Sequence, residues 1–149
     1  MHYFVTGATG FIGRRLVKAL LARKGSTVHF LVRAGSEGKV AGLLDEWGVP
    51  KARAIAVVGD LTARKLGVAA DVIKSLKGRI DAVYHLAAVY DLAADEESQV
   101  RVNIEGTRHL VEFAKAIDAG HLHHVSSIAA AGLYEGVFRE DMFDEAENL

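Results

Sequence analysis

Three glycines with the spacing G-x-x-G-x-x-G, Gly7, Gly10 and Gly13, directly follow the apolar run at residues 3–5. The run predicts a β-strand, and the residues after Gly13 have apolar side chains at helical spacing. A strand, a glycine-rich turn and a helix in this order form a dinucleotide-binding unit, because the N–H groups at the helix start face the ligand's phosphates. A structural strand-to-helix turn would explain one glycine and leave the other two unexplained.

Each glycine of this turn has its own expected role. Gly7 lets the chain leave the strand in a tight turn, and Gly10 leaves room for a pyrophosphate against bare backbone. Gly13 lets the helix lie close to the sheet. We therefore assign to the cofactor site the turn residues Gly7, Thr9, Gly10, Phe11 and Ile12.

The composition excludes several classes of protein. Half of the 149 residues are hydrophobic and a quarter are charged, which indicates one globular domain over residues 1–149. The 18 basic residues balance 19 acidic ones without clustering, so a nucleic-acid partner is not expected. With no cysteine, the chain has no disulfide, thiolate zinc site or thiol nucleophile.

The location expected from the sequence is the cytoplasm. The chain begins on its first predicted strand, so we expect no secretory signal before the fold. No apolar run approaches the ~20 residues that span a bilayer. The lack of cysteine fits a reducing compartment.

Strand and helix patterns alternate along the chain. Strands are predicted near residues 3–5, 27–32, 54–58, 80–86 and 123–127, and helices near 12–24, 37–47, 68–76 and 95–118. This alternation predicts an α/β fold, a Rossmann-type doubly wound parallel sheet with its switch point between the first and fourth strands. Because only an acidic stretch follows, the sheet is expected to be truncated after the fifth strand, with an unpaired edge that makes a homodimer possible.

Two apolar stripes are predicted to face the core. In the first helix the stripe is Ile12, Leu16, Ala19 and Leu20. In the longest helix it is Val100, Ile104, Thr107, Val111 and Ala114.

Five sequence motifs together resemble one family. They are TGATGFIG at 6–13, LVRAGS at 31–36, GDLT at 59–62, VYHLAAVYD at 83–91 with NIEGT at 103–107, and HVSSIAAAG at 124–132. With them the chain resembles the N-terminal half of an extended short-chain dehydrogenase/reductase. It is most similar to NADPH-dependent reductases of the thioester-reductase and fatty acyl-CoA reductase type. The resemblance implies a small-molecule carbonyl or acyl-thioester substrate.

The end of the second strand indicates the cofactor. Arg33 lies twenty residues beyond Gly13, where NAD-preferring enzymes place a carboxylate on the ribose 2′-hydroxyl. A guanidinium there offers several donors to a 2′-phosphate, which favours NADP (NADPH). Arg14 and Lys39 are candidates to assist, and an ordinary exposed arginine at a strand end is the alternative.

Further candidates follow the third and fourth strands. Asp60 can accept a hydrogen bond from the adenine amino group, with Leu61 packed on the ring; the alternative is that Asp60 or Thr62 caps the next helix. Ala87 and Ala88 are small residues, as needed where backbone meets the nicotinamide side of the cofactor. The resemblance further implies that Asn103 supports the site, although a simple polar helix position also explains it.

The resemblance implies a catalytic role for Ser127. This serine closes the fifth predicted strand and matches the family's Ser/Thr that binds the substrate carbonyl oxygen. Strand periodicity puts Ser126 on the other face, and a loop-capping serine is the alternative.

The family's Tyr-x-x-x-Lys pair is missing. The residues four places after the tyrosines at 3, 84, 90 and 134 are Gly7, Ala88, Ala94 and Phe138. Without a nearby cation a phenol is a poor acid at neutral pH, so the chain alone is expected to be inactive.

The histidines at 121, 123 and 124 invite a metal-site interpretation. No nearby acid or cysteine completes such a site, so no metal is expected.

The sequence therefore predicts the cofactor-binding part of an NADPH-dependent reductase. A nucleotide-sugar epimerase or dehydratase of the same fold is the enzymatic alternative. A non-catalytic NADP-sensing protein is an alternative of a different class.

Overall fold

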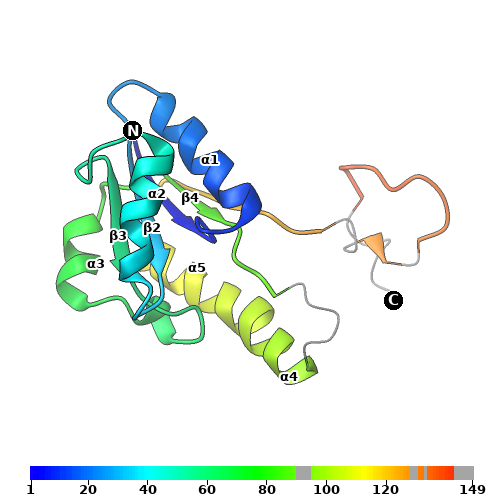
Figure 1. Ribbon diagram of the computed structural model, residues 1–149. Coiled ribbons are helices and arrows are strands. Elements are labelled where there is room, and N and C mark those ends of the chain that lie inside the picture. The colour runs from blue at the N-terminus through cyan, green and yellow to red at the C-terminus, as the bar shows by residue number, and fades with distance from the viewer. Residues whose placement is uncertain (90–94, 128–130, 133, 143–149) are drawn as a thin grey trace.

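The computed structural model describes residues 1–89, 95–127, 131–132 and 134–142. Its centre is a five-stranded parallel sheet with the order β3-β2-β1-β4-β5 (Figure 1). The strands are β1 (His2–Thr6), β2 (Thr27–Val32), β3 (Ala54–Val58), β4 (Ala82–His85) and β5 (His121–His124). The predicted α/β Rossmann-type fold is confirmed, with β1 and β4 adjacent at the switch point.

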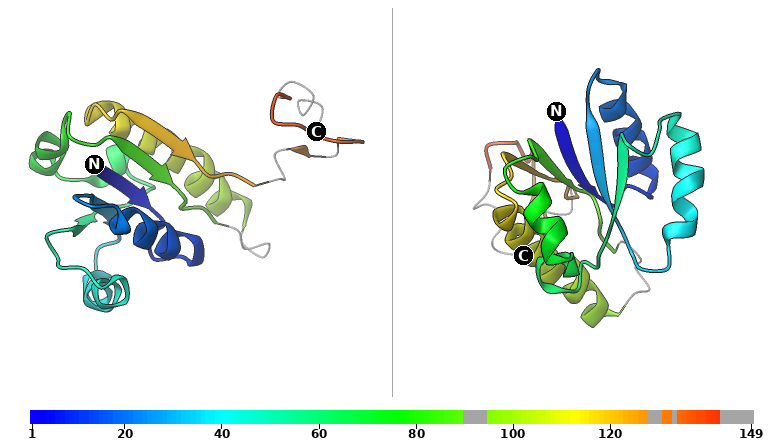
Figure 2. Two further views of the ribbon diagram at one scale, coloured as in Figure 1. Left: turned by 90° about the horizontal axis from the view of Figure 1, so that it is seen from above. Right: turned by 90° about the vertical axis from the view of Figure 1, so that its left-hand side faces the viewer.

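Helices cover both faces of this sheet (Figures 1 and 2). One layer holds α1 (Phe11–Ala22) and α2 (Val40–Trp47), the latter preceded by the short turn η1 (Glu37–Lys39). The other layer holds α3 (Ala70–Leu76) and α5 (Gly106–Ala116), with the short turn η2 (Arg64–Gly67) beside α5. Before α5 the chain forms α4 (Glu96–Gln99) and the π-helical turn η3 (Val100–Glu105).

Each helical layer has its own hydrophobic core against the sheet. In the α1–α2 layer, Trp47 meets Phe30 edge-on with ring centroids 5.2 Å apart. In the other layer, Phe113 packs on Phe4 with centroids 4.7 Å apart. Because both faces of β1 and β2 are buried, their sequences are almost continuously apolar. The carboxyl ends of these strands are thereby held rigidly for the loops that follow them.

The last two strands are shorter than predicted. β4 covers Ala82–His85 instead of 80–86, and β5 covers His121–His124 instead of 123–127. β5 is an exposed edge strand, and within the described residues it pairs only with β4. The last bond between them runs from Val125 N–H to His85 O. Because β4 ends at His85, Ser126 and Ser127 lie beyond the end of the neighbouring strand.

Both predicted apolar stripes are shifted. α1 buries Gly13, Val17, Leu20 and Leu21, whereas Ile12 is 60% exposed. α5 buries Gly106, Leu110, Phe113 and Ala114, while Ile104 is 56% exposed. The prediction carried one 3.6-residue period through residues 95–118, but a π-helical turn changes the phase of the helix. The larger side chains Leu110 and Phe113 then face the core.

No helix among the described residues is both long enough and apolar enough to cross a bilayer.

Candidate cofactor site

The glycine turn after β1 lies tightly against the segment that leaves β4. Gly7 has a φ of +72°, and a Cβ there would come within 2.7 Å of Ala87 N and 2.8 Å of Leu86 C. The turn is closed by a hydrogen bond of 3.0 Å from Gly10 N–H to Gly7 O. Only glycine therefore fits at this position, for its backbone conformation and for its packing. The predicted tight turn is confirmed.

The other two glycines of the turn differ in what surrounds them. A Cβ on Gly13 would overlap Gly7 O and lie 2.8 Å from Ala8 Cα. The close approach that Gly13 permits is therefore to the turn itself, whereas the sequence predicted an approach to the sheet. A Cβ on Gly10 would meet only Gly7 O, at 3.3 Å, and φ there is −77°. Gly10 is the glycine whose outer side the protein leaves open.

Among the residues that the structure describes, the first N–H groups of α1 donate no helical hydrogen bond at this open side. The first backbone bond of the helix runs from Arg14 N–H to Gly10 O (3.0 Å), so the N–H groups of Phe11, Ile12 and Gly13 precede it. The first turn contains no acidic residue, and Phe11 is 75% exposed. The positive end of the helix dipole and these donors suit a pyrophosphate.

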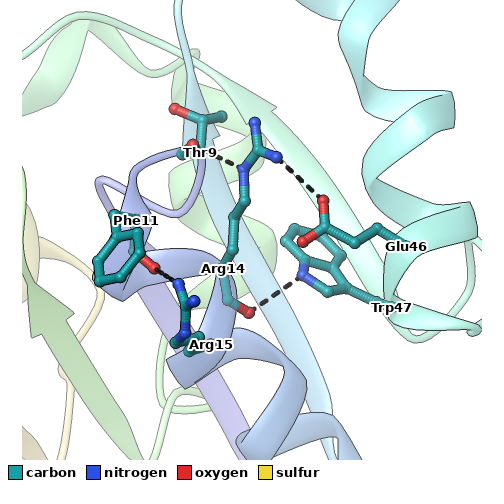
Figure 3. Close-up of polar contacts among 6 residues, drawn as sticks. All are labelled: Thr9, Phe11, Arg14, Arg15, Glu46 and Trp47. Carbon is teal, nitrogen blue, oxygen red and sulfur yellow. Dashed lines mark hydrogen bonds and ion pairs between the residues drawn. The ribbon is translucent and has the colours of Figure 1, made fainter.

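Arginine side chains brace the turn from outside (Figure 3). Arg14 Nε donates to Thr9 O at 2.9 Å, and its Nη1 forms an ion pair with Glu46 at 3.1 Å. The Arg14 carbonyl also accepts from the Trp47 indole at 3.2 Å, and Arg15 lies over the Phe11 ring. Arg14 thus links the glycine turn to α2 and is already paired; its assistance to Arg33 is untested.

Arg33 directly follows β2 and is exposed. Within the described part of the chain, its guanidinium makes no hydrogen bond or ion pair. Asp60 is the acidic side chain whose charge it influences, since the guanidinium helps to hold the pKa of that carboxyl down. Arg33 is therefore an exposed cation at the carboxyl edge of the sheet, and its contact with a 2′-phosphate stays a prediction.

Asp60 closes the turn that follows β3. Its Oδ1 accepts hydrogen bonds of 2.8 Å from both the N–H and the hydroxyl of Thr62. Those two bonds lower the pKa of Asp60 below its usual value. The residues that cap η2 and α3 are Ala63 and Ala69, so the predicted capping of the next helix is wrong. Asp60 stabilises a local turn instead.

Leu61 lies half-buried against the start of α5. Its carbonyl is 3.0 Å from His109 Nδ1, and a Cβ on Gly106 would lie 3.3 Å from Leu61 Cβ. The leucine is therefore held at the edge of the sheet where an adenine ring was predicted.

Asn103 fixes the segment that follows Ala87 and Ala88. Its Oδ1 accepts from Val89 N–H at 2.8 Å, and its Nδ2 donates to Val89 O at 3.1 Å. Both ends of the amide thus hold the backbone of one residue. Ala88 is exposed and Ala87 half-buried beside the glycine turn. Asn103 lies in the π-helical turn, and its role in supporting the site stays a prediction.

Ser127 does not close a strand. β5 ends at His124, so Ser127 lies three residues beyond it and is exposed. The alternation of faces that separated Ser127 from Ser126 does not apply, because neither residue is in a strand. Both lie on the segment that follows the carboxyl end of β5.

The clustered histidines belong to another part of the sheet. His123 stacks on Tyr84 with ring centroids 4.6 Å apart, beside a cavity of about 430 Å³ that Tyr3 and His121 also line. Among the residues that the structure describes, no three His, Asp or Glu side chains come together as metal ligands.

Sequence analysis missed two polar residues near the turn, His85 and Thr107. His85 is 1% exposed at the end of β4, and Thr107 is the second residue of α5. A histidine within the predicted strand 80–86 is the available signal, because a buried polar side chain needs hydrogen-bond partners.

We expect His85 to make the fold sensitive to acid. Burial, followed by the charge of His124, lowers the pKa of His85 from 6.5 to about 4. Between pH 6.5 and pH 4, His85 binds a proton in the unfolded chain but stays neutral in the folded chain. The free energy of unfolding therefore falls as the pH drops from about 6.5 to about 4. The contribution of the neutral His85 ring to the free energy of unfolding is complete above pH 6.5 and amounts to roughly 3 kcal/mol.

Urea unfolding of the wild type and His85→Asn between pH 7 and pH 4.5 measures this loss. His29, whose pKa burial also lowers, contributes in the same direction in both proteins. An equal pH slope in both proteins would contradict the assignment to His85.

The chain matches a family model described as Male sterility protein (NAD_binding_4) over residues 5–148. One of the proteins that make up linear gramicidin synthase in Brevibacillus parabrevis is 32% identical over 158 residues, covering 97% of this chain and 3% of that protein. A putative fatty acyl-CoA reductase from Drosophila melanogaster is 29% identical, covering 78% of this chain and 24% of that protein.

The chain is also similar to solved structures of two kinds of protein. The terminal R domain from the myxalamid PKS-NRPS biosynthetic pathway superposes with a TM-score of 0.80 at 29% identity, covering 95% of this chain and 38% of that one. UDP-glucuronic acid 4-epimerase from Bacillus cereus, in complex with NAD, gives a TM-score of 0.70 at 30% identity, covering 95% and 45%. The chain thus spans less than half of each of these proteins.

Proposed function

The chain belongs to the Male sterility protein (NAD_binding_4) family, and from this we propose that it is the cofactor-binding part of an NADPH-dependent reductase. The substrate class is a carbonyl compound or an acyl thioester. The observation that carries the proposal is the glycine turn, in which the protein fills the space around Gly7 and Gly13 and leaves Gly10 open. An open backbone at a helix N-terminus suits a pyrophosphate.

The residues around the turn divide the binding of a dinucleotide among them. The N–H groups of Phe11 and Ile12 hold the pyrophosphate, and Arg33 pairs with the 2′-phosphate. Asp60 and Leu61 hold the adenine, while the Ala87–Ala88 backbone leaves space for the nicotinamide ribose.

Ser127 serves the reaction in this proposal. When bound, a reduced nicotinamide dinucleotide supplies a hydride to the carbonyl carbon of the substrate. The Ser127 hydroxyl donates a hydrogen bond to the carbonyl oxygen and stabilises the negative charge that develops on it. The proton that this oxygen finally takes comes from a tyrosine outside residues 1–149. This division agrees with the likeness to a terminal R domain over 38% of that chain.

Replacing Arg33 with Ala is expected to weaken NADPH binding about 10- to 100-fold and to leave NADH binding nearly unchanged. Hydrogen bonds to a charged group contribute about 1.5–3 kcal/mol each, and only NADPH carries the 2′-phosphate. Calorimetric titration of both dinucleotides into both proteins measures the difference. Arg79→Ala, which removes an equal charge just before β4, is the control and should change neither affinity. Equal losses for NADPH and NADH would refute the role of Arg33.

A nucleotide-sugar epimerase is the second candidate function. The likeness to the Bacillus cereus epimerase, at 30% identity over 95% of this chain, favours it. The same titration separates the candidates, because tighter binding of NADH than of NADPH by the wild type would favour the epimerase.

A further inference from the structure

A series of four linked hydrogen bonds, with Thr6 and His85 buried within it, runs behind the glycine turn. Thr6 Oγ1 lies 2.7 Å from His85 Nδ1, and His85 Nε2 lies 3.1 Å from Thr107 Oγ1. At one end Ala87 N–H donates to Thr6 Oγ1 at 3.3 Å, and at the other Thr107 donates to Asn103 O at 2.6 Å. Thr6 and His85 are at most 1% exposed. These bonds join β1, β4, η3 and α5, and the bond between Thr6 and His85 is out of reach of solvent.

The carbonyl of Asn103 determines which atom donates and which accepts in each of these hydrogen bonds. A carbonyl oxygen only accepts, so the Thr107 hydroxyl must donate its proton to Asn103 O. In its bond with His85, the Thr107 oxygen is therefore the acceptor. His85 must then carry its proton on Nε2, which leaves Nδ1 as an acceptor for the Thr6 hydroxyl. The oxygen of Thr6 in turn accepts from Ala87 N–H. Each hydroxyl donates once and accepts once, with the ring neutral.

Both ends of this series of hydrogen bonds reach the backbone of the candidate site. Thr6 directly precedes Gly7, where a Cβ would meet the backbone of Ala87 and Leu86. Asn103, whose carbonyl ends the series, holds Val89 with its side chain. The ring of His85 thus stands between two groups that set the position of residues 87–89 relative to the glycine turn.

We propose that His85, protonated on Nε2 alone and held between Thr6 and Thr107, is a positioning residue for the dinucleotide. It acts through the backbone of residues 87–89, which it holds at a fixed place against the glycine turn. This inference rests on the proposed function, since it concerns the affinity of the same site for NADPH. Buried polar groups that are fully paired in this way specify one arrangement of the backbone around them.

Two measurements on residues 1–149 test the proposal. Long-range ¹H–¹⁵N NMR of the wild type at pH 7 should show the His85 ring protonated on Nε2. Titration with NADPH should show about 5- to 10-fold weaker binding by Thr107→Val, which keeps the volume of the side chain but removes the acceptor for Nε2–H. Thr107→Ser restores that hydroxyl, and its affinity should return to within about twofold of the wild type.

Thr27→Val, the same substitution at the start of β2 and at the other end of the sheet, is the matched control and should bind NADPH like the wild type. Wild-type affinity in Thr107→Val, or a ring protonated on Nδ1, would overturn the role of His85 alone. The tautomer is read from the wild type, so it decides the point even where a variant does not fold. A wild-type chain that binds no NADPH would overturn the proposed function as well.

Discussion

Gly13→Ala is expected to destabilise the fold by about 3 kcal/mol or more, whereas Gly10→Ala keeps the fold and loses measurable NADPH binding. A Cβ at Gly13 would overlap the Gly7 carbonyl and crowd Ala8 Cα, and backbone atoms of a tight turn cannot move aside. At Gly10 the nearest protein atom is 3.3 Å from the new Cβ, so the methyl group intrudes mainly on the ligand. Thermal unfolding and NADPH titration of both variants separate the two effects.

Gly42→Ala supplies the control for the glycine pair. Gly42 lies inside α2, and a Cβ there meets nothing within 4 Å. Alanine in a helix interior should stabilise the fold by about 0.5–1 kcal/mol and leave NADPH binding unchanged. A wild-type melting temperature for Gly13→Ala, or wild-type affinity for Gly10→Ala, would contradict the placement of the turn.

Ser127→Ala is expected to lower kcat by roughly 10- to 1,000-fold in an extended protein that carries a Tyr-x-x-x-Lys pair. The substitution removes one hydrogen-bond donor from the oxygen on which charge develops in the transition state. NADPH oxidation with an aldehyde or acyl-thioester substrate measures the loss. Residues 1–149 alone should show no turnover, because no tyrosine in the chain is followed four residues later by lysine.

Ser126→Ala is the matched control for this prediction, since it removes the neighbouring hydroxyl from the same segment. It should keep kcat within a few-fold of the wild type. Equal losses in both variants, or turnover by residues 1–149 alone, would contradict the role of Ser127.

The sequence predicted correctly those elements whose structure depends on residues close together in the chain. The spacing of Gly7, Gly10 and Gly13 after an apolar run identified β1, the turn and α1, because each glycine answers a steric need within a few residues. The alternation of strands and helices likewise predicted the parallel sheet and its switch point between β1 and β4, since parallel crossovers are right-handed and need helices.

The sequence predicted less well where the outcome depends on distant partners. Ser127 was placed in a strand, although β5 can extend only as far as its single neighbour β4, which ends at His85. The stripe of the long helix was shifted because a π-helical turn gives no signal in residue periodicity. The pairing of Arg14 with Glu46, 32 residues away, is likewise a tertiary contact that spacing does not encode.

Amide NMR of ¹⁵N-labelled residues 1–149 during titration with NADPH and NADH tests most directly whether a dinucleotide lies across the glycine turn. Both dinucleotides should shift the amide signals of the turn, Gly7–Gly13, and of Ala87, and NADPH alone should strongly shift those of Arg33–Ser36. Shifts confined to residues around Tyr84 and His123, or an unperturbed turn at saturating NADPH, would contradict the binding of a dinucleotide at this site.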